Sequence, residues 1–366
     1  MGCSKPATQL GLPDGSTQNV STLFRTFLPK PPIAFALHGD EDVRSNEQSQ
    51  EIPSALPRVE VRPSPGRGSG LFAVDRIPAF TRILEDDALI SLAEGEDLPE
   101  AWQKYCLLPP DDKKIIDDLT YPSSHLAEKQ KSIITQLKQR GYGSEKATKM
   151  ARLNARWQTN AFTTEGPKIG THWLRALFGQ VAKINHSCTP NAHSHCRAPA
   201  TQFVYAVRDI EAGEEIEIAY FDITMPYADR QARAKYMGFE CTCPACSLTG
   251  HLALSNYEQR LAIVHKHISV DFNTPNPWAY IDSTQTAINI AHSAEYPWLG
   301  VSLPRLYQAL FSLRMRLQFS NTQLDEAVMK GVEWQDNITG PDSPESRIAR
   351  KVREDARKLN YGKPRK

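Results

Sequence analysis

Two short segments of the sequence concentrate residue types that bind metals. Asn185 to Cys196 reads NHSCTPNAHSHC and holds two cysteines and three histidines. Glu240 to Cys246 reads ECTCPAC and holds three cysteines. Three thiolates so close together can wrap one zinc ion, but a tetrahedral structural site needs four ligands. The second segment therefore predicts a zinc site that takes one more ligand from elsewhere in the chain.

Spacing alone leaves the fourth ligand open. The candidates are Cys188, Cys196, His186, His193, His195 and His251. A self-contained site within residues 185–196 would compete with the three cysteines for metal, and Pro190 breaks any helix that could align those side chains. The alternative for the cysteine trio is a set of small buried residues at a strand end. This alternative is disfavoured because the spacing is a known ligand spacing.

Composition and charge exclude several classes of protein. The chain has 366 residues, 40% hydrophobic and 23% charged, which suits one large globular domain or two smaller ones. A formal net charge of +1 gives no global attraction to nucleic acid or to an anionic membrane. No apolar stretch approaches the roughly 20 residues needed to span a bilayer. We therefore expect neither membrane insertion nor strong direct nucleic-acid binding.

The N-terminus and the cysteines predict an intracellular location. No charged-then-apolar signal peptide is present, and Pro6 stands where a myristoylation signal needs Ser or Thr. Seven cysteines without an export signal are expected to be reduced thiols or metal ligands. We expect the protein in the nucleus, the cytoplasm or both. The basic C-terminal run KLNYGKPRK is expected to be a solvated tail.

Alternation of apolar and polar residues predicts strands around the metal-binding segments. Residues 58–77, RVEVRPSPGRGSGLFAVDRI, alternate on both sides of a Pro/Gly turn and predict a strand, a loop and a strand. The segment ILEDDALISL at 83–92 continues this pattern. Further short strands are predicted at Gln202–Arg208 and Glu215–Ala219. Residues 1 to about 55 are rich in Pro, Ser, Gln and acidic residues and predict a mobile leader.

Helical periodicity marks two other regions. Between about 97 and 158, one set of apolar residues has the spacing of a helix face: Ile115, Leu119, Ile133 and Leu137. After Cys246, two apolar stripes predict further helices: Tyr257, Leu261, Val264 and Ile268, then Leu303, Leu306, Leu310, Leu313 and Leu317. The pattern predicts a β-rich core that is interrupted by a helical insert and followed by a helical C-terminal region.

Four stretches occur in the order found in SET-domain protein lysine methyltransferases, and the chain resembles that family. They are GRGSGLFAV at 66–74, INHSCTPN at 184–191, IEAGEEIEIAYFD at 210–222 and FECTCPAC at 239–246. Together with NAFTT at 160–164 and YAVRDI at 205–210, they look most like the SET-and-MYND branch. Each stretch alone is a weak signal, but the ordered set is highly specific. The resemblance covers roughly residues 57 to 247.

The resemblance implies an α+β fold: a β-rich SET fold of small sheets with a pseudoknot, a helical insert, a post-SET zinc site and an α-helical C-terminal region. The implied boundaries are a leader at 1–55, a SET domain at 56–237 with its insert at about 97–158, a post-SET segment at 238–250 and helices at 251–366. Between Leu71 and Lys183 the only cysteine is Cys106, so the zinc-rich MYND module of that branch is absent.

The resemblance also implies which residues contact S-adenosylmethionine. The matching positions are Arg67, Gly68, Ser69, Gly70, Asn160, Asn185, His186, Tyr220 and Phe239. Among them, Tyr220 matches the catalytic tyrosine, Phe239 the aromatic residue over the adenine, and Asn160 a position that holds the cofactor's amino-acid end. The first four form a loop whose backbone lies against the cofactor. Glycines suit such a loop because they permit close backbone approach.

The same resemblance assigns the missing zinc ligand. Cys188 matches the residue that joins Cys241, Cys243 and Cys246 on a structural zinc ion, with four thiolates and no open position for water. His193, His195 and Cys196 are then bystanders. The zinc would join a distant loop to the chain after Tyr220 and would fix Phe239, which precedes the first ligand of the trio by two residues.

The implied activity is transfer of a methyl group to the side-chain amine of a lysine in a protein substrate, histone or non-histone, by a monomeric enzyme. Such a displacement depends on alignment and exclusion of water. The attacking lysine, with an ordinary pKa of about 10.4, must be neutral. An apolar channel and a nearby sulfonium both favour the neutral amine. Met237 stands where relatives often place an aromatic residue that lines this channel, which leaves the degree of methylation open.

Two other classes of function compete with this interpretation. The first is a catalytically silent SET scaffold that binds protein partners, motivated by Met237 and the unusual insert. The second is a zinc-dependent nucleic-acid binder, motivated by the cysteine cluster and the basic tail. The near-neutral charge and the lack of a repeated finger pattern argue against the second class.

Overall fold

The computed structural model describes residues 56–358, apart from residues 94, 122, 166–172, 198–199, 249–250 and 269–275. The leader predicted for residues 1–55 lies outside the described residues, as does the basic tail after residue 358. Among the helices of the described part, none combines the length and the apolar character needed to cross a bilayer.

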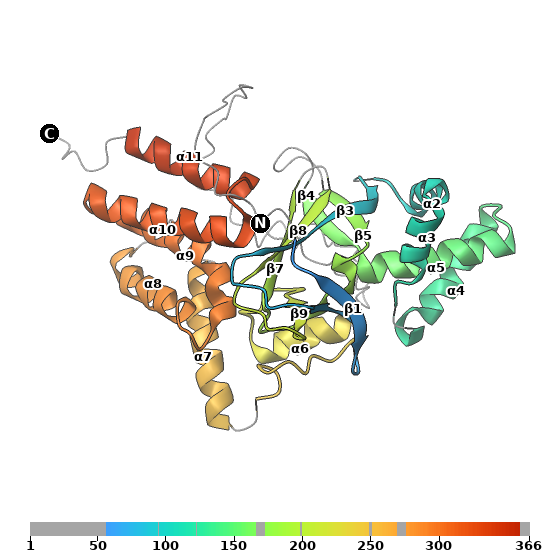
Figure 1. The fold of residues 1–366 in the computed structure, drawn as a ribbon, viewed down its shortest axis with the longest axis horizontal. Coiled ribbons are helices and arrows are strands. Elements are labelled where there is room, and N and C mark those ends of the chain that lie inside the picture. Colours follow the sequence, from blue (N-terminus) through green and yellow to red (C-terminus); the bar gives the residue numbers. More distant parts are fainter. Residues whose placement is uncertain are drawn as a thin grey trace.

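Two small sheets occupy the middle of the molecule (Figure 1). The first has four strands in the order β1-β2-β9-β6. Its strands are β1 (Val59–Ser64), β2 (Gly68–Ala73), β9 (Glu215–Ile218) and β6 (Asn185–His186). The β1–β2 hairpin turns at Gly66, whose φ of 73° is a left-handed conformation that glycine adopts easily. Strand β6 runs parallel to β9 and places Asn185 opposite Glu217.

The second sheet has five strands in the order β4-β5-β3-β8-β7, and its neighbouring strands are antiparallel. Its strands are β3 (Arg82–Leu92), β4 (Phe162–Glu165), β5 (Trp173–Phe178), β7 (Ala192–Arg197) and β8 (Thr201–Ala206). Side chains from both sheets share one buried apolar cluster, which includes Leu71, Phe162, Phe178 and Ile216. The predicted strands at 202–208 and 215–219 are therefore present, but each ends slightly earlier than the apolar pattern suggested.

A helical insert lies between β3 and β4. It consists of α2 (Leu98–Leu107), α3 (Pro110–Asp117), α4 (Ser123–Gln139) and α5 (Ser144–Asn160). The prediction that Ile115 and Leu119 share one helix face is wrong. Helix α3 starts at Pro110 and ends at Asp117, and it buries Ile116 while Ile115 is 37% exposed. Leu119 reaches the same core from the turn that follows the helix.

Helices also make up the chain after β9. They are α6 (Tyr227–Tyr236), α7 (His251–Ile268), α8 (Trp278–Ala291), the 3₁₀ helix η2 (Pro297–Ser302), α9 (Leu303–Arg316), α10 (Asn321–Thr339) and α11 (Pro344–Lys358). Most of the predicted stripes on α7 and α9 share one core: Tyr257, Leu261, Val264, Leu303, Leu306 and Leu310 are buried in it. Ile268 is partly buried against this core, Leu313 is also buried, and Leu317 lies just beyond the end of α9. Cys188, Cys241 and Cys243 belong to that same core.

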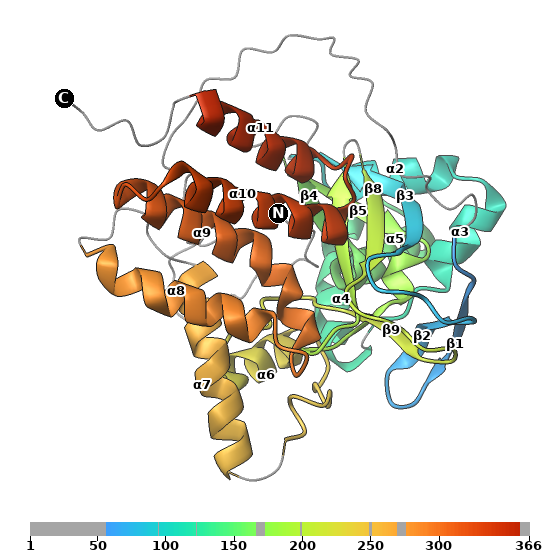
Figure 2. The ribbon, with the colours of Figure 1, turned by 60° about the vertical axis from the view of Figure 1, so that its left-hand side comes forward.

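The insert and the C-terminal helices flank the sheets on opposite sides (Figures 1 and 2). The predicted α+β fold class is confirmed: the chain combines small, mostly antiparallel sheets with a helical insert, a helical C-terminal region and a cluster of four cysteines. The exact domain boundaries remain predictions.

Candidate active site and metal centre

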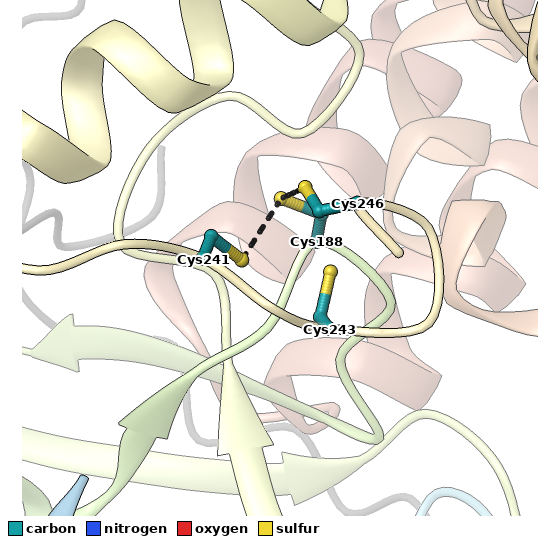
Figure 3. Close-up of side chains that lie close together, drawn as sticks. All are labelled: Cys188, Cys241, Cys243 and Cys246. Carbon is teal, nitrogen blue, oxygen red and sulfur yellow. Dashed lines mark hydrogen bonds between the residues drawn. The ribbon is translucent and has the colours of Figure 1, made fainter. Parts of the chain in front are cut away.

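Four cysteines from two distant parts of the chain meet beside the sheets. Cys188 lies in the loop after β6, and Cys241, Cys243 and Cys246 lie in the segment after α6. Their sulfur atoms all lie within 4.8 Å of one another, and the Cys188 Sγ is 3.9 Å from that of Cys241 and 3.7 Å from that of Cys246. Figure 3 shows the four side chains pointing toward a common centre. All except the half-buried Cys246 are buried.

This cluster has the dimensions of a tetrahedral zinc site. A Zn–S bond of about 2.3 Å in a tetrahedron places neighbouring sulfurs about 3.8 Å apart, which matches the two distances above. Contact with the sulfurs of Cys241, Cys243 and Cys246 raises the pKa of the Cys188 thiol, because four thiolates without a cation repel one another. A divalent cation would remove that repulsion. The cluster is thus compatible with a structural zinc ion.

His186 links the cysteine cluster to Tyr220. Its Nδ1 accepts a hydrogen bond from the Tyr220 backbone N–H at 3.0 Å. A neutral imidazole with Nδ1 as acceptor carries its proton on Nε2, and that atom lies 3.4 Å from the Cys188 Sγ. The ring is 5% exposed and packs against the rings of Tyr220 and Phe239 at centroid distances of 5.2 and 5.6 Å. The His186 ring therefore couples the position of Cys188 to that of Tyr220.

The phenol of Tyr220 is held in a defined orientation. Its hydroxyl donates to the Ile184 carbonyl at 2.5 Å, and the Phe239 ring meets its ring edge-on at 6.1 Å. Burial raises the pKa of the Tyr220 phenol well above its ordinary value. The hydroxyl is therefore neutral at physiological pH, and it can orient a neighbouring group by hydrogen bonding rather than act as a phenolate base.

The glycine-bearing loop lies against Asn185. The Asn185 side-chain amide donates to the Ser69 carbonyl at 3.0 Å and to Glu215 Oε1 at 2.7 Å. A Cβ at Gly70 would lie 2.1 Å from Glu215 Oε1, so any larger residue would displace the Glu215 side chain from its contacts with Arg67 and Asn185. Gly68 has a φ of 77°, which favours glycine. The structure thus brings this loop together with Asn185, a residue more than a hundred positions later.

Two acidic residues beside this loop were missed in the sequence analysis. Arg67 forms ion pairs with Glu215 and Glu217, whose side chains are 11% and 19% exposed. Burial raises the pKa of Glu217, although the hydrogen bond from Arg67 opposes that effect. Alternate residues of a strand share one face, so the EIEI run of β9 did carry a signal for this pair. Carboxylates beside the rings of Tyr220 and Phe239 suit a ligand that carries positive charge.

Asn160 contacts the insert rather than the residues around Tyr220. Its side chain is 5% exposed, and its amide donates to the backbone carbonyls of Thr120 at 2.9 Å and Arg156 at 3.0 Å. These bonds fix the end of α5 to the turn after α3. The cofactor contact expected for Asn160 remains a prediction.

Arg230 was also missed, because its helix reads as an ordinary solvated surface. The side chain is fully buried next to the cysteine cluster, and its guanidinium pairs with Glu258 of α7 at 2.9 Å. It also donates to the Met225 carbonyl at 2.6 Å, and Glu258 accepts the Tyr227 backbone N–H at 2.7 Å. This buried ion pair joins α6, which follows the sheets, to the C-terminal helices.

The remaining histidines of the 185–196 segment lie on β7, apart from the sulfur cluster. His195 is fully buried and its ring lies 5.6 Å from that of Phe203. Burial lowers the pKa of His193 to about 4 and that of His195 to about 2, so both rings are neutral at physiological pH. Their surroundings are those of packed structural side chains.

Comparison with known proteins finds similarity to one family over part of the chain. Residues 68–221 match the model of the SET domain. The chain is 27% identical over 238 residues to histone-lysine N-methyltransferase set5 of Schizosaccharomyces pombe, a match that covers 64% of this chain and 65% of that protein. It is 39% identical over 97 residues to N-lysine methyltransferase SMYD2-B of Xenopus laevis, covering 26% of this chain and 22% of that protein.

The human protein N-lysine methyltransferase SMYD2 shows a similar relationship. It is 36% identical over 97 residues, which cover 26% of this chain and 22% of the human protein. The chain therefore spans less than two thirds of the length of each of these relatives.

Proposed function

We propose that this chain, in which residues 68–221 form a SET domain, transfers a methyl group from S-adenosylmethionine to the side-chain amine of a lysine in a protein substrate. The relatives named above are lysine methyltransferases, which supports the reaction class. The observation that carries the proposal is that Tyr220, Asn185 and the glycine-bearing loop meet around β9: Asn185 donates to the Ser69 carbonyl, and the Tyr220 hydroxyl donates to the carbonyl of the preceding residue, Ile184. These are the residue types that this reaction needs, and they come from distant parts of the chain.

The residues around Tyr220 suit the proposed cofactor. When bound, S-adenosylmethionine supplies a methyl group on a positively charged sulfonium. Glu215 and Glu217 provide negative charge beside the loop, and Phe239 provides an aromatic face. The backbone of residues 67–70 and the side chain of Asn185 would hold the cofactor's polar groups, and Asn160 and the backbone of His186 would add further contacts.

The protein's own part in the reaction is alignment. The neutral Tyr220 hydroxyl can accept a hydrogen bond from a lysine amine and direct its lone pair at the methyl carbon. The buried aromatic surroundings disfavour the ammonium form of that lysine, because a charged group loses hydration there. A lysine proton must therefore leave before transfer. Correct orientation of the phenol depends on its backbone, which His186 holds.

A metal ion at the four cysteines would hold neighbouring residues in place and would take no part in the methyl transfer itself. Four thiolates would saturate a zinc ion at Cys188, Cys241, Cys243 and Cys246, so no coordination position remains for a substrate. The ion would fix the loop that carries His186 and the segment that carries Phe239. Both of these side chains contact the Tyr220 ring.

The decisive experiment compares the wild type with Tyr220→Phe. Zinc-loaded protein is incubated with radiolabelled cofactor and with separated histone and cytosolic protein pools. We expect the variant to lose about a hundredfold in transfer while it binds the cofactor normally by calorimetry. Tyr280→Phe, which changes a tyrosine of the distant helix α8, is the matched control. Absence of cofactor binding by the zinc-loaded wild type would refute the enzyme assignment.

A catalytically silent scaffold is the second candidate. Met237, which caps the end of α6, stands where relatives often place a channel-lining aromatic residue. This function predicts a folded protein that binds partners but labels neither pool. A labelled protein that disappears with Tyr220→Phe would dismiss it. Both histone and non-histone substrates, and both nuclear and cytoplasmic locations, are consistent with the proposed enzyme.

A further inference from the structure

The tip of the β1–β2 hairpin is held to β9 by side chains. Strand β2 pairs with β9 at Leu71 and Phe72, and in the described part of the chain no such backbone pair includes residues 65–70. Because the two strands are antiparallel, this tip lies toward the end of β9 that leads to Tyr220. The tip contains the glycine-bearing loop, residues 67–70, whose backbone is proposed to hold the cofactor.

Packing does little to fix this tip. Residues 65–69 are exposed, and a Cβ placed on Gly66 or Gly68 would meet no described atom within 4 Å beyond its chain neighbours. Both glycines have a positive φ, and glycine reaches other backbone conformations at little cost. The bond from the Arg67 N–H to the Ser64 carbonyl closes the hairpin but does not join it to β9. The tip therefore depends on side-chain contacts to keep one position.

Arg67 supplies the main contact of this kind. Its guanidinium pairs with Glu215 and with Glu217, which are alternate residues of β9 and so lie on one face of that strand. We call these three residues the Arg67 bridge. Glu215 also accepts hydrogen bonds from Ser64 Oγ at 2.9 Å and from the Asn185 amide at 2.7 Å. The hairpin and β6 thus meet at carboxylates of β9.

The same contacts argue against a direct bond from the Arg67 side chain to the cofactor. An incoming carboxylate would have to displace Glu215 and Glu217 from the guanidinium. Each of these two side chains is less than one fifth exposed, so separation from its cation would leave a mostly buried charge uncompensated. The guanidinium is better suited to hold the loop while the loop's backbone faces the ligand.

The Arg67 bridge lies close to the phenol of Tyr220. The Tyr220 hydroxyl donates to the carbonyl of the residue before Asn185. Asn185 is in turn opposite Glu217 in the β6–β9 pairing and bonds Glu215 through its side chain. Burial is the main cause of the raised pKa of Tyr220, and the charged groups of the Arg67 bridge are the further ones. A shift of the loop would therefore occur beside the proposed reaction centre.

We infer that Glu217, together with Glu215, is a positioning residue for the cofactor: it holds Arg67 and so keeps the backbone of the glycine-bearing loop in the form that binds. The inference rests on the proposed function and adds Glu217 to its residues. The methyl donor and its product, S-adenosylhomocysteine, differ only in the methyl group and the charge on sulfur. A role in loop position therefore affects the binding of both molecules alike.

Calorimetry of full-length, zinc-loaded protein measures the binding of the methyl donor and of S-adenosylhomocysteine. The test variants are Arg67→Met, Glu217→Gln and the two combined, and Arg67→Lys keeps the charge. The matched control is Arg58→Met, which removes an exposed pair with Asp75 elsewhere on the same hairpin. Hydrogen exchange of residues 65–70 and thermal unfolding are measured on the same proteins without ligand. Thermal unfolding separates loss of the fold from loss of the loop, and Arg67→Lys serves where Arg67→Met fails to fold.

We expect Arg67→Met to lose about tenfold in affinity for both ligands, with faster exchange at residues 65–70. Glu217→Gln should lose about fivefold because Glu215 still holds the guanidinium, and the combined variant should lose no more than Arg67→Met. Arg67→Lys should lose less, since an ammonium is a single point of charge that cannot bridge as a guanidinium does. The KM for the cofactor should rise by more than kcat falls. Arg58→Met should bind as the wild type does.

Several results would overturn the inference. Normal binding by Glu217→Gln beside a loss in Arg67→Met would mean that the guanidinium contacts the cofactor directly. Losses that add in the combined variant would show that the two residues act separately. A loss for the methyl donor alone would assign the carboxylates to the sulfonium charge. Normal binding by all variants of an active wild type would refute this inference alone, whereas a wild type that binds neither ligand would refute the proposed function with it.

Discussion

The C-terminal helices and the helical insert flank the same sheets, but they treat buried charge in opposite ways. On the C-terminal side, the buried cation Arg230 is paired with Glu258 and lies in a core that includes three of the four cysteines. On the insert side, the half-buried cation Arg175 lies 5.7 Å from the centroid of the Trp157 ring and 3.5 Å from Gln158 Oε1. One region pairs its buried cation with a carboxylate, whereas the other places its cation beside an aromatic ring and a neutral amide.

This difference bears on how each side is held to the sheets. The C-terminal side packs against the loop with His186 and the segment with Phe239, so it fixes the geometry around Tyr220. The insert side holds its cation without an opposite charge within ion-pair distance among the described residues. The two sides should therefore respond differently when charge or metal is removed. Four perturbations test this contrast.

Metal removal should have the largest effect and should act on one side of the molecule. Chelation of zinc should destabilise the C-terminal core by several kcal/mol, because binding free energy of structural zinc is about 10–16 kcal/mol in small domains. Hydrogen exchange should accelerate in α7 and α9 far more than in α4 and α5. Equal acceleration in both sets of helices would show that the cysteine cluster does not anchor the C-terminal side specifically.

Loss of the buried ion pair should have the next largest effect. Glu258→Gln leaves the Arg230 cation buried without its counter-charge, so the free energy of unfolding should fall by about 3–5 kcal/mol. Glu295→Gln is the control, because its pair with Arg260 is exposed and should contribute less than about 1 kcal/mol. Chemical denaturation measures both. Similar small losses in the two variants would remove the distinction between the regions.

The two arginines should respond differently to the same substitution. Arg230→Met should destabilise the protein because it leaves the partly buried Glu258 without its counter-charge. Arg175→Met should change the free energy of unfolding by less than about 1 kcal/mol, because it removes a half-buried cation that has no carboxylate within ion-pair distance among the described residues. Thermal denaturation of both variants measures this difference. A large loss in Arg175→Met would mean that this arginine has a structural partner.

The smallest expected effect is a dependence on pH at the junction with α7. The hydrogen bond that His265 donates to Asp222 raises the pKa of His265 above 6.5, so the stabilisation from His265 is complete below 6.5 and is lost as pH rises through the raised value. Burial alone would raise the pKa of Asp222, but the hydrogen bonds that it accepts from His265 and Thr224 outweigh burial, so its pKa is lowered. The lowered pKa means that the stabilisation from Asp222 is present above 3.8 and is lost as pH falls through the lowered value.

Stabilisation by this pair is therefore greatest between 3.8 and 6.5. The difference in unfolding free energy between wild type and His265→Gln should shrink from about pH 6 to about pH 8. The change should stay below about 1 kcal/mol because both side chains are partly exposed. A difference that grows with pH would contradict the assigned pairing.

Much of the fold was predictable from local sequence pattern. The period of two in residues 58–77 and in Glu215–Ile218 predicted strands, and the stripes on α7 and α9 predicted buried helix faces. The insert was harder, because the burial of Ile116 and Leu119 depends on a helix that ends at Asp117 and on packing against α5. Helical spacing alone does not reveal where a short helix stops.

The candidate site was predictable only in part, for a similar reason. The order of the sequence motifs was enough to predict that Cys188 joins the cysteine trio. That prediction did not depend on how the intervening residues fold. Arg230 and Arg175 had no such signal. Each is one arginine among many, and its importance comes from burial and from the presence or absence of a carboxylate nearby. These are properties of the folded chain, which periodicity and spacing do not encode.

The separation of 53 residues between Cys188 and Cys241 affects how the protein matures. During synthesis, β7, β8, β9 and α6 must emerge before the last three thiols become available. A four-thiolate site can therefore close only after these elements have been made. An ion bound by the trio alone would have three protein ligands, and Cys188 would complete the set only once the loop after β6 has reached the segment after α6.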